Sequence, residues 1–115
     1  MTAPNLRLYA LVDPAQCGGR PAAEVAAAAA AGGATLLQVR AKAVTTRALV
    51  ALVEVVQAAA RPFGVPVVVN DRADVAHATG AAGVHLGPDD LDPAAARRLL
   101  GPAALVGCSA GTPAE

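Results

Sequence analysis

The fold is decided by residues 65–91, which read VPVVVNDRADVAHATGAAGVHLGPDDL. Two short apolar runs, 65–70 and 82–86, flank a segment that predicts a helix over Ala73–Thr79, ended by a glycine. Continuous valine-rich runs of this length are typical of strands buried on both faces of a parallel sheet. Each run is followed by an aspartate, Asp71 or Asp90. Because the carboxyl ends of parallel strands meet at one edge of a sheet, we expect these two acids to lie close together.

The same alternation of strand and helix extends outward in both directions along the chain. Apolar runs predict the strands, while helical spacing, cap residues and glycine stops predict the helices. In chain order, the expected elements are a strand over 6–12, a loop over 13–20, a helix from Pro21 to about Ala31, a strand over 35–40, a helix capped by Thr45 or Thr46 and ending at Ala60, a strand over 65–70, a helix over 73–79, a strand over 82–86, a helix begun by Asp92-Pro93 and ending at Leu100, and a strand over 103–108. Residues 109–115 are expected to form a loop that enters another helix. No linker or repeat divides the series, which predicts one α/β domain over residues 1–115.

The order of elements fits either a barrel or an open sheet. A closed barrel of eight βα units needs about 200–250 residues, whereas an open doubly wound sheet can be complete at the length of this chain. The first strand, however, is not followed by a Gly-x-Gly-x-x-Gly turn, and polar residues cluster after the later four strands. We therefore expect part of a parallel (β/α)8 TIM barrel, with about five strands and four helices. Its open edges, at 6–12 and 103–108, favour self-association.

The composition excludes several classes of protein. The formal net charge is zero, which argues against nucleic acid or an anionic membrane as the main partner. The longest apolar run, 25–31, is far shorter than the roughly 20 residues of a membrane span, and no signal peptide is read at the start. Cys17 and Cys108 are too few for a disulfide scaffold. These features predict a cytoplasmic protein with reduced thiols.

Charged residues at the ends of the predicted strands suggest a site for a metal and an anion. Asp71 and Asp90 offer the oxygen ligands that Mg2+ prefers, and Mg2+ usually brings a substrate phosphate with it. Arg40 and Lys42 follow the second strand, where paired cations can hold a diphosphate. The alternative for Arg40 and Lys42 is that they are ordinary solvated charges in a loop. The alternative for Asp71 and Asp90 is that they only form turns.

The sequence leaves the roles of three further polar residues open. Ser109 can donate a hydrogen bond to a substrate or cap a helix that begins near Thr112. His77 is expected on a helix and His85 inside a strand, where a structural role is favoured over a catalytic one. Neither histidine has a second one at zinc-ligand spacing. The two cysteines are not assigned a role either.

Taken together, these residues resemble the thiamine-phosphate synthase family. The matching stretches are LYALVD over 8–13, LQVRAK over 37–42, VVNDRADVA over 68–76, GVHLGPDDL over 83–91 and GCS over 107–109. The resemblance implies a (β/α)8 barrel and a transferase of thiamine biosynthesis that couples hydroxymethylpyrimidine diphosphate to thiazole phosphate. Diphosphate would leave from the pyrimidine CH2 carbon, and the thiazole nitrogen would attack the resulting cation.

The resemblance also implies a role for each matched residue. The pyrimidine diphosphate would be bound by Gln38, Val39, Arg40, Ala41, Lys42 and Asn70. Asp71 and Asp90 would hold Mg2+, and Ser109 would contact the pyrimidine. No catalytic acid or base is implied, because charge on the leaving group would be stabilised electrostatically.

The sequence departs from the family pattern in two ways. Ala41 and Pro88 replace the more usual glutamate and glutamine, which the proposed chemistry does not need. The resemblance covers only about the first half of the family barrel, so we expect little turnover from these 115 residues alone. The alternatives are a thiazole tautomerase-like homologue, disfavoured by the two acidic motifs and by the lack of histidine in 108–115, and a silent fragment that binds diphosphate.

Overall fold

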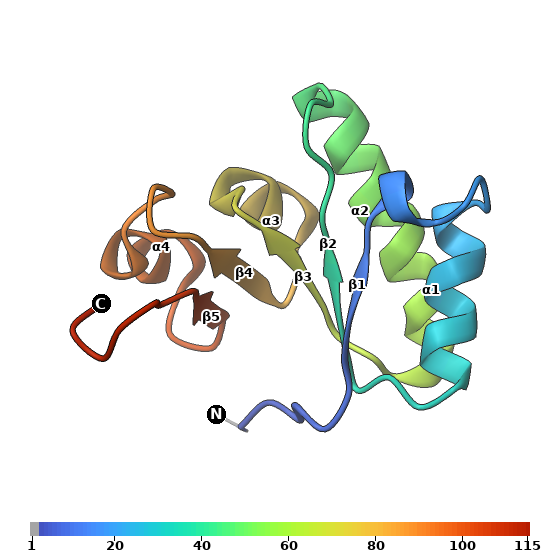
Figure 1. The fold of residues 1–115 in the computed structure, drawn as a ribbon, viewed down its shortest axis with the longest axis horizontal. Helices are drawn as coiled ribbons and strands as arrows, with labels where there is room; N and C mark the ends of the chain where they lie inside the picture. Colours follow the sequence, from blue (N-terminus) through green and yellow to red (C-terminus); the bar gives the residue numbers. More distant parts are fainter. Residues whose placement is uncertain (1–2) are drawn as a thin grey trace.

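The computed structural model describes residues 3–115, and its strands form one parallel sheet in chain order (Figure 1). The strands are β1 (Tyr9–Val12), β2 (Leu36–Val39), β3 (Val67–Asn70), β4 (Gly83–Leu86) and β5 (Leu105–Cys108). Each is hydrogen-bonded in parallel to the next, in the order β1-β2-β3-β4-β5. The carboxyl ends of all five strands therefore lie at one edge of the sheet, which we call the rim.

A helix follows each of the first four strands and packs back against the sheet. These helices are α1 (Ala22–Ala31), α2 (Thr46–Ala60), α3 (Ala73–Thr79) and α4 (Pro93–Leu100), and short 3-10 turns lie at η1 (Pro14–Gln16) and η2 (Arg61–Phe63). The side chains of Thr45 and Asp92 cap α2 and α4, as the sequence predicts. In Figure 1, α1 and α2 lie beside β1 and β2, and α3 and α4 lie beside β3 to β5.

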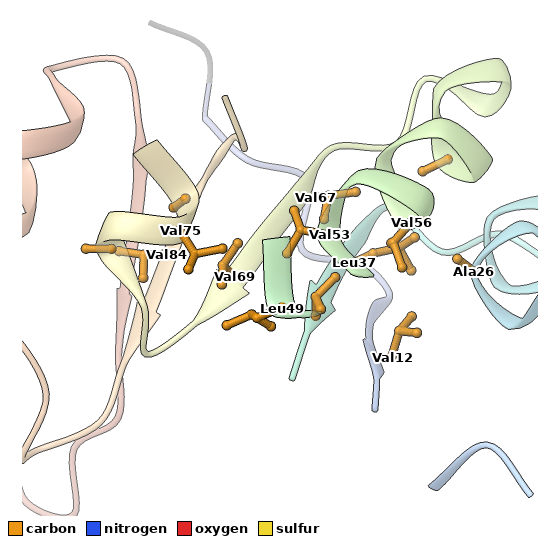
Figure 2. Packing of buried hydrophobic residues seen from close by; sticks show 14 of the residues in the cluster. Val12, Ala26, Leu37, Leu49, Val53, Val56, Val67, Val69, Val75 and Val84 are labelled. Atoms are coloured by element: carbon orange, nitrogen blue, oxygen red, sulfur yellow. The ribbon is translucent and has the colours of Figure 1, made fainter. Parts of the chain in front are cut away.

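The hydrophobic core lies between the sheet and its helices (Figure 2). It is built from small aliphatic side chains because the chain is only 2% aromatic. Val53 and Val56 of α2 face Leu37 of β2 and two valines of β3, Val67 and Val69, while α1 contributes fully buried Ala26. Alanine at this position lets α1 approach the sheet closely, since its side chain ends at Cβ.

The opposite face of the sheet carries a second set of side chains. Leu36, Val68 and Gln38 are buried although they lie outside the helix-side cluster. Tyr9 and His85 line a hollow of about 380 Å3 on this face together with Leu36 and Val68. Among residues 3–115, β1 and β5 each pair with one neighbour only, so the sheet does not close on itself. The structure thus confirms a five-stranded part of a barrel-like α/β fold.

The order of the elements is confirmed, and the strands begin later than the sequence suggests. The first strand begins at Tyr9 rather than at residue 6. Before Tyr9, side-chain contacts of Thr35 replace part of the backbone pairing between the first two strands. The Thr35 Oγ1 accepts from the Leu8 N–H at 3.1 Å and donates to the Asn5 carbonyl at 2.9 Å. Residues 109–115 form the expected loop, with bends and a turn, and no helix begins near Thr112 in the described chain. No helix among residues 3–115 is long and apolar enough to cross a bilayer.

Candidate functional site

Asp71 and Asp90 face each other at the rim, across the junction of β3 and β4. Asp71 directly follows β3 with a left-handed backbone (φ +71°), a conformation that aspartate tolerates better than most residues. Its N–H donates to the His85 carbonyl at 2.7 Å, which ties this turn to β4. Asp90 is held by its own turn, because its Oδ2 accepts from the Gly87 N–H at 2.7 Å. As predicted, the two carboxyl groups lie within hydrogen-bonding reach of each other.

The two carboxyl groups shift each other's pKa in opposite directions. Hydrogen bonding to Asp90 raises the pKa of Asp71, and burial and the negative charge of Asp90 act in the same direction. The pKa of Asp90 is lowered, first by its hydrogen bond with Asp71 and then by the Gly87 N–H. Asp71 is therefore the member of the pair that binds a proton more readily, since the additional N–H bond stabilises the charged form of Asp90. The positive charge of Lys42 opposes the shift at Asp71.

A divalent cation could lie between the two carboxylates and offset their mutual repulsion. Carboxylate oxygens suit Mg2+, which commonly takes only one or two protein carboxylates and completes its shell with water and phosphate. In the described part of the chain, no group of three or more His, Cys, Asp or Glu side chains is arranged to hold a metal. The donor set therefore fits a cation that arrives with a phosphate ligand better than a closed structural metal site.

The two rim cations each contact a neighbouring strand end. Lys42 Nζ donates to Asn70 Oδ1 at 3.0 Å, which joins the end of β2 to the end of β3. Arg40 Nη1 donates to Asp13 Oδ2 at 2.7 Å, which joins β2 to the end of β1. Arg40 and Lys42 are thus held by specific contacts, although both remain open to solvent. Lys42 donates to a neutral amide, and it also lies close enough to Asp71 and Asp90 for its positive charge to act to lower the pKa of both carboxyl groups.

Three other residues from the LQVRAK stretch differ in what they offer a ligand. Gln38 is only 4% exposed, and its Nε2 donates to the Tyr9 hydroxyl at 2.9 Å on the open face of the sheet. Val39 is fully buried in the helix-side core, so any ligand contact would use its backbone. Ala41 packs against the same core from its edge. Of this stretch, Arg40 and Lys42 carry the charge at the rim.

Ser109 follows β5 and completes the row of rim contacts. Its Oγ lies 2.9 Å from His85 Nε2, and its N–H donates to the Leu86 carbonyl at 2.9 Å. Ser109 is exposed and does not cap a helix, because 109–115 contain none. It lines a cleft together with Asp90. One side-chain contact therefore spans each of the four strand junctions: Asp13–Arg40, Lys42–Asn70, Asp71–Asp90 and His85–Ser109.

Sequence reasoning missed Asp13 and Tyr9 as parts of this arrangement. Asp13 is 8% exposed, and its Oδ1 also accepts from the Ala15 N–H at 3.0 Å, which caps η1. The signal was present, because Asp13 directly follows a strand whose carboxyl end had to lie beside that of β2. The same rule had identified Asp71 and Asp90. Burial raises the pKa of the Tyr9 hydroxyl, which leaves it protonated beside Gln38.

Comparison with known proteins identifies one family. A sequence profile described as thiamine monophosphate synthase matches residues 8–115. The chain is 47% identical over 108 residues to the thiamine-phosphate synthase of Azorhizobium caulinodans, covering 94% of this chain and 51% of that protein. It is 45% identical over 111 residues to the thiamine-phosphate synthase of Xanthobacter autotrophicus, covering 96% of this chain and 53% of that one.

A solved structure gives the same result. The thiamine phosphate pyrophosphorylase from Pyrococcus furiosus superposes with a TM-score of 0.79 at 31% identity, covering 92% of this chain and 52% of the other. The chain therefore spans about half the length of the relatives and the structure it matches.

Proposed function

The chain belongs to the thiamine monophosphate synthase family, and from that membership we propose that its rim binds hydroxymethylpyrimidine diphosphate together with Mg2+. The reaction to which this site would contribute is the coupling of that diphosphate to thiazole phosphate, giving thiamine phosphate and diphosphate. The observation that carries the proposal is the pairing of Asp71 and Asp90 beside Lys42, with Arg40 on the adjoining junction.

Each residue has a role that follows from its contacts. Lys42 and Arg40 would bind diphosphate oxygens, Lys42 as a compact charge and Arg40 through the N–H groups that Asp13 leaves free. Asn70 would orient Lys42 through the hydrogen bond that it accepts. Asp71 and Asp90 would hold Mg2+, which when bound supplies positive charge to the leaving diphosphate. Ser109 would contact the pyrimidine.

The chemistry asks for electrostatic stabilisation rather than a strong base. As the C–O bond to diphosphate breaks, negative charge grows on the leaving oxygens and positive charge on the pyrimidine CH2 carbon. Cations fixed on the diphosphate side favour that separation, and they act best when they are positioned before the bond breaks. The contacts of Arg40 with Asp13 and of Lys42 with Asn70 provide such positioning.

Isothermal titration of the chain with the pyrimidine diphosphate, with and without Mg2+, tests the proposal. We expect Mg2+-dependent binding that Asp71→Asn weakens and that Arg40→Ala weakens by about 1.5–3 kcal/mol, the range for a charge-assisted contact. Arg98→Ala is the matched control, because Arg98 is an exposed arginine in the last turn of α4, remote from the rim. Equal affinity in Arg40→Ala and Arg98→Ala would contradict the assignment. A parallel assay with thiazole phosphate separates turnover from binding alone.

A further inference from the structure

His85 and Ser109 form a contact that joins the last two strands at the rim. His85 lies on the open face of β4, and its Nε2 is 2.9 Å from Ser109 Oγ. Ser109 is exposed, so nothing in its own packing selects one rotamer of its hydroxyl. The histidine ring, by contrast, is partly buried and held against β5. The ring therefore fixes the hydroxyl, rather than the reverse.

Gly107 shows that the position of the ring is built into β5. Gly107 pairs directly with His85 in the β4–β5 register. A Cβ added at Gly107 would lie 2.7 Å from His85 Nδ1, closer than side-chain carbons approach ring atoms in real structures. The atom in the way is part of a ring anchored near its own strand, so any larger residue would push the ring from this place. Glycine at 107 leaves the space that the imidazole occupies.

We propose that His85 is a positioning residue that orients the Ser109 hydroxyl toward the pyrimidine of a ligand bound at the rim. The inference rests on the proposed function for the identity of that ligand. Either neutral tautomer of His85 fixes the hydroxyl, and the tautomer decides what Ser109 keeps for the ligand. If Nε2 accepts, Ser109 presents lone pairs, and if Nε2 donates, Ser109 presents its proton.

The role predicts a selective loss of affinity. In the proposed complex, Arg40, Lys42 and the acidic pair would face the diphosphate, whereas Ser109 lies at the last junction of the row, between β4 and β5. Removing the imidazole should therefore weaken recognition of the pyrimidine and leave recognition of diphosphate unchanged. A general structural defect would weaken both.

Titration of the chain with pyrimidine diphosphate and with inorganic diphosphate, both with Mg2+, measures this selectivity. We expect His85→Ala to lose about two- to tenfold in affinity for the first and nothing for the second, as for one neutral hydrogen bond. Ser109→Ala should lose the same amount, with no further loss in the double variant. His85→Gln, whose amide reaches the same hydroxyl, should recover part of the loss. His77→Ala is the matched control, because His77 is the other histidine and lies on α3. Parallel losses for both ligands would overturn the proposal.

Nitrogen NMR of the imidazole side chains tests the contact without any ligand. With only two histidines the spectrum is readily assigned. Ser109→Ala should shift the Nε2 resonance of His85 and leave His77 unchanged, and Gly107→Ala should shift His85 as well. An unmoved His85 in Ser109→Ala would refute the positioning role even if binding is as proposed. Absence of pyrimidine diphosphate binding in the unmodified chain, with the NMR contact intact, would instead contradict the proposed function.

Discussion

Replacing Asp13 by asparagine or alanine separates two contacts that this buried aspartate makes at the end of β1. Its Oδ2 accepts from Arg40 Nη1 at 2.7 Å, and its Oδ1 accepts from the Ala15 N–H at 3.0 Å. Asparagine keeps an oxygen for Ala15 but removes the negative charge opposite Arg40. Alanine removes both contacts. The difference between the two variants therefore reports the cap alone.

The expected losses follow from burial. The side chain of Asp13 is 9% exposed and that of Arg40 is 40% exposed, so their pair lies between a buried and a surface ion pair. We expect Asp13→Asn to lower the free energy of unfolding by about 1 kcal/mol, near the upper end of the range for solvent-exposed pairs. Loss of a helix cap costs about 1 kcal/mol more. Asp13→Ala should therefore lose about 2 kcal/mol.

Urea unfolding followed by circular dichroism measures both variants, with the slope against urea checked for constancy. A double-mutant cycle between Asp13→Ala and Arg40→Ala isolates the ion pair, because the cap contributes equally with and without Arg40. Equal losses in Asp13→Asn and Asp13→Ala would show that the cap contributes nothing. A coupling free energy of zero would refute the argument for the pair.

The same variants address how Arg40 is used. If Asp13 positions Arg40 for diphosphate, Asp13→Asn should weaken Mg2+-dependent binding about two- to tenfold, the scale of one hydrogen bond. The alternative is competition, in which Asp13 neutralises a cation that the ligand needs. Tighter binding in Asp13→Asn would establish competition and refute positioning.

Three further predictions concern the acidic pair, the β4–β5 contact and the open edges. In carboxyl NMR titrations without metal, we expect the pKa of Asp71 above its ordinary value of 3.8 and that of Asp90 below it, with Asp90→Asn lowering the pKa of Asp71. Because the folded-state pKa of Asp71 is raised, its contribution to the free energy of unfolding is complete in acid and is lost as the pH rises through that pKa. If both carboxyl groups titrate at the ordinary pKa of an aspartate, the pairing is contradicted. Gly83→Ala should lower the free energy of unfolding by about 3 kcal/mol, since overpacking against a backbone cannot be relieved by a rotamer change: its Cβ would lie 1.9 Å from the Leu105 carbonyl oxygen. Hydrogen exchange should show the loss in β5, and unchanged protection there would refute it. Sedimentation velocity at micromolar concentration should show self-association of the 115-residue chain through β1 and β5, and a monodisperse monomer would contradict it.

Four of the five strand ends were predictable from sequence, whereas the beginnings were not; the exception is β2, which ends at Val39 rather than at residue 40. Val12, Asn70, Leu86 and Cys108 end strands where the sequence predicts, because glycine or polar side chains follow directly. A beginning depends on where the neighbouring strand starts to pair, which no local pattern records. The first strand shows this, since Leu6 and Leu8 are apolar yet lie outside the ladder that begins at Tyr9. The site lies at the carboxyl ends of the strands, so the positions of its residues could be predicted from the sequence.

Which side chains of the site contact each other was harder to predict than which residues belong to the site. The contacts Asp13–Arg40, Lys42–Asn70 and His85–Ser109 join residues 27, 28 and 24 positions apart. Strand order fixes which ends are neighbours, but side-chain reach decides which groups meet. Asp13 was missed because an aspartate at a strand end before a proline also fits a simple turn, and the sequence does not show that its side chain reaches Arg40.

The four junction contacts differ in one respect that bears on ligand binding. The contacts of Asp13 with Arg40, of Lys42 with Asn70 and of His85 with Ser109 each join a donor to an acceptor, so they are favourable in the chain as it stands. The junction of β3 and β4 instead joins two carboxyl groups, which repel each other unless a proton or a cation lies between them. A left-handed backbone at Asp71 sustains this arrangement, and such strain persists where the surrounding structure fixes it. The β3–β4 junction is therefore the one of the four where a proton or a cation is needed between the two side chains, and it lies beside Lys42, which in the proposed function would hold the accompanying anion.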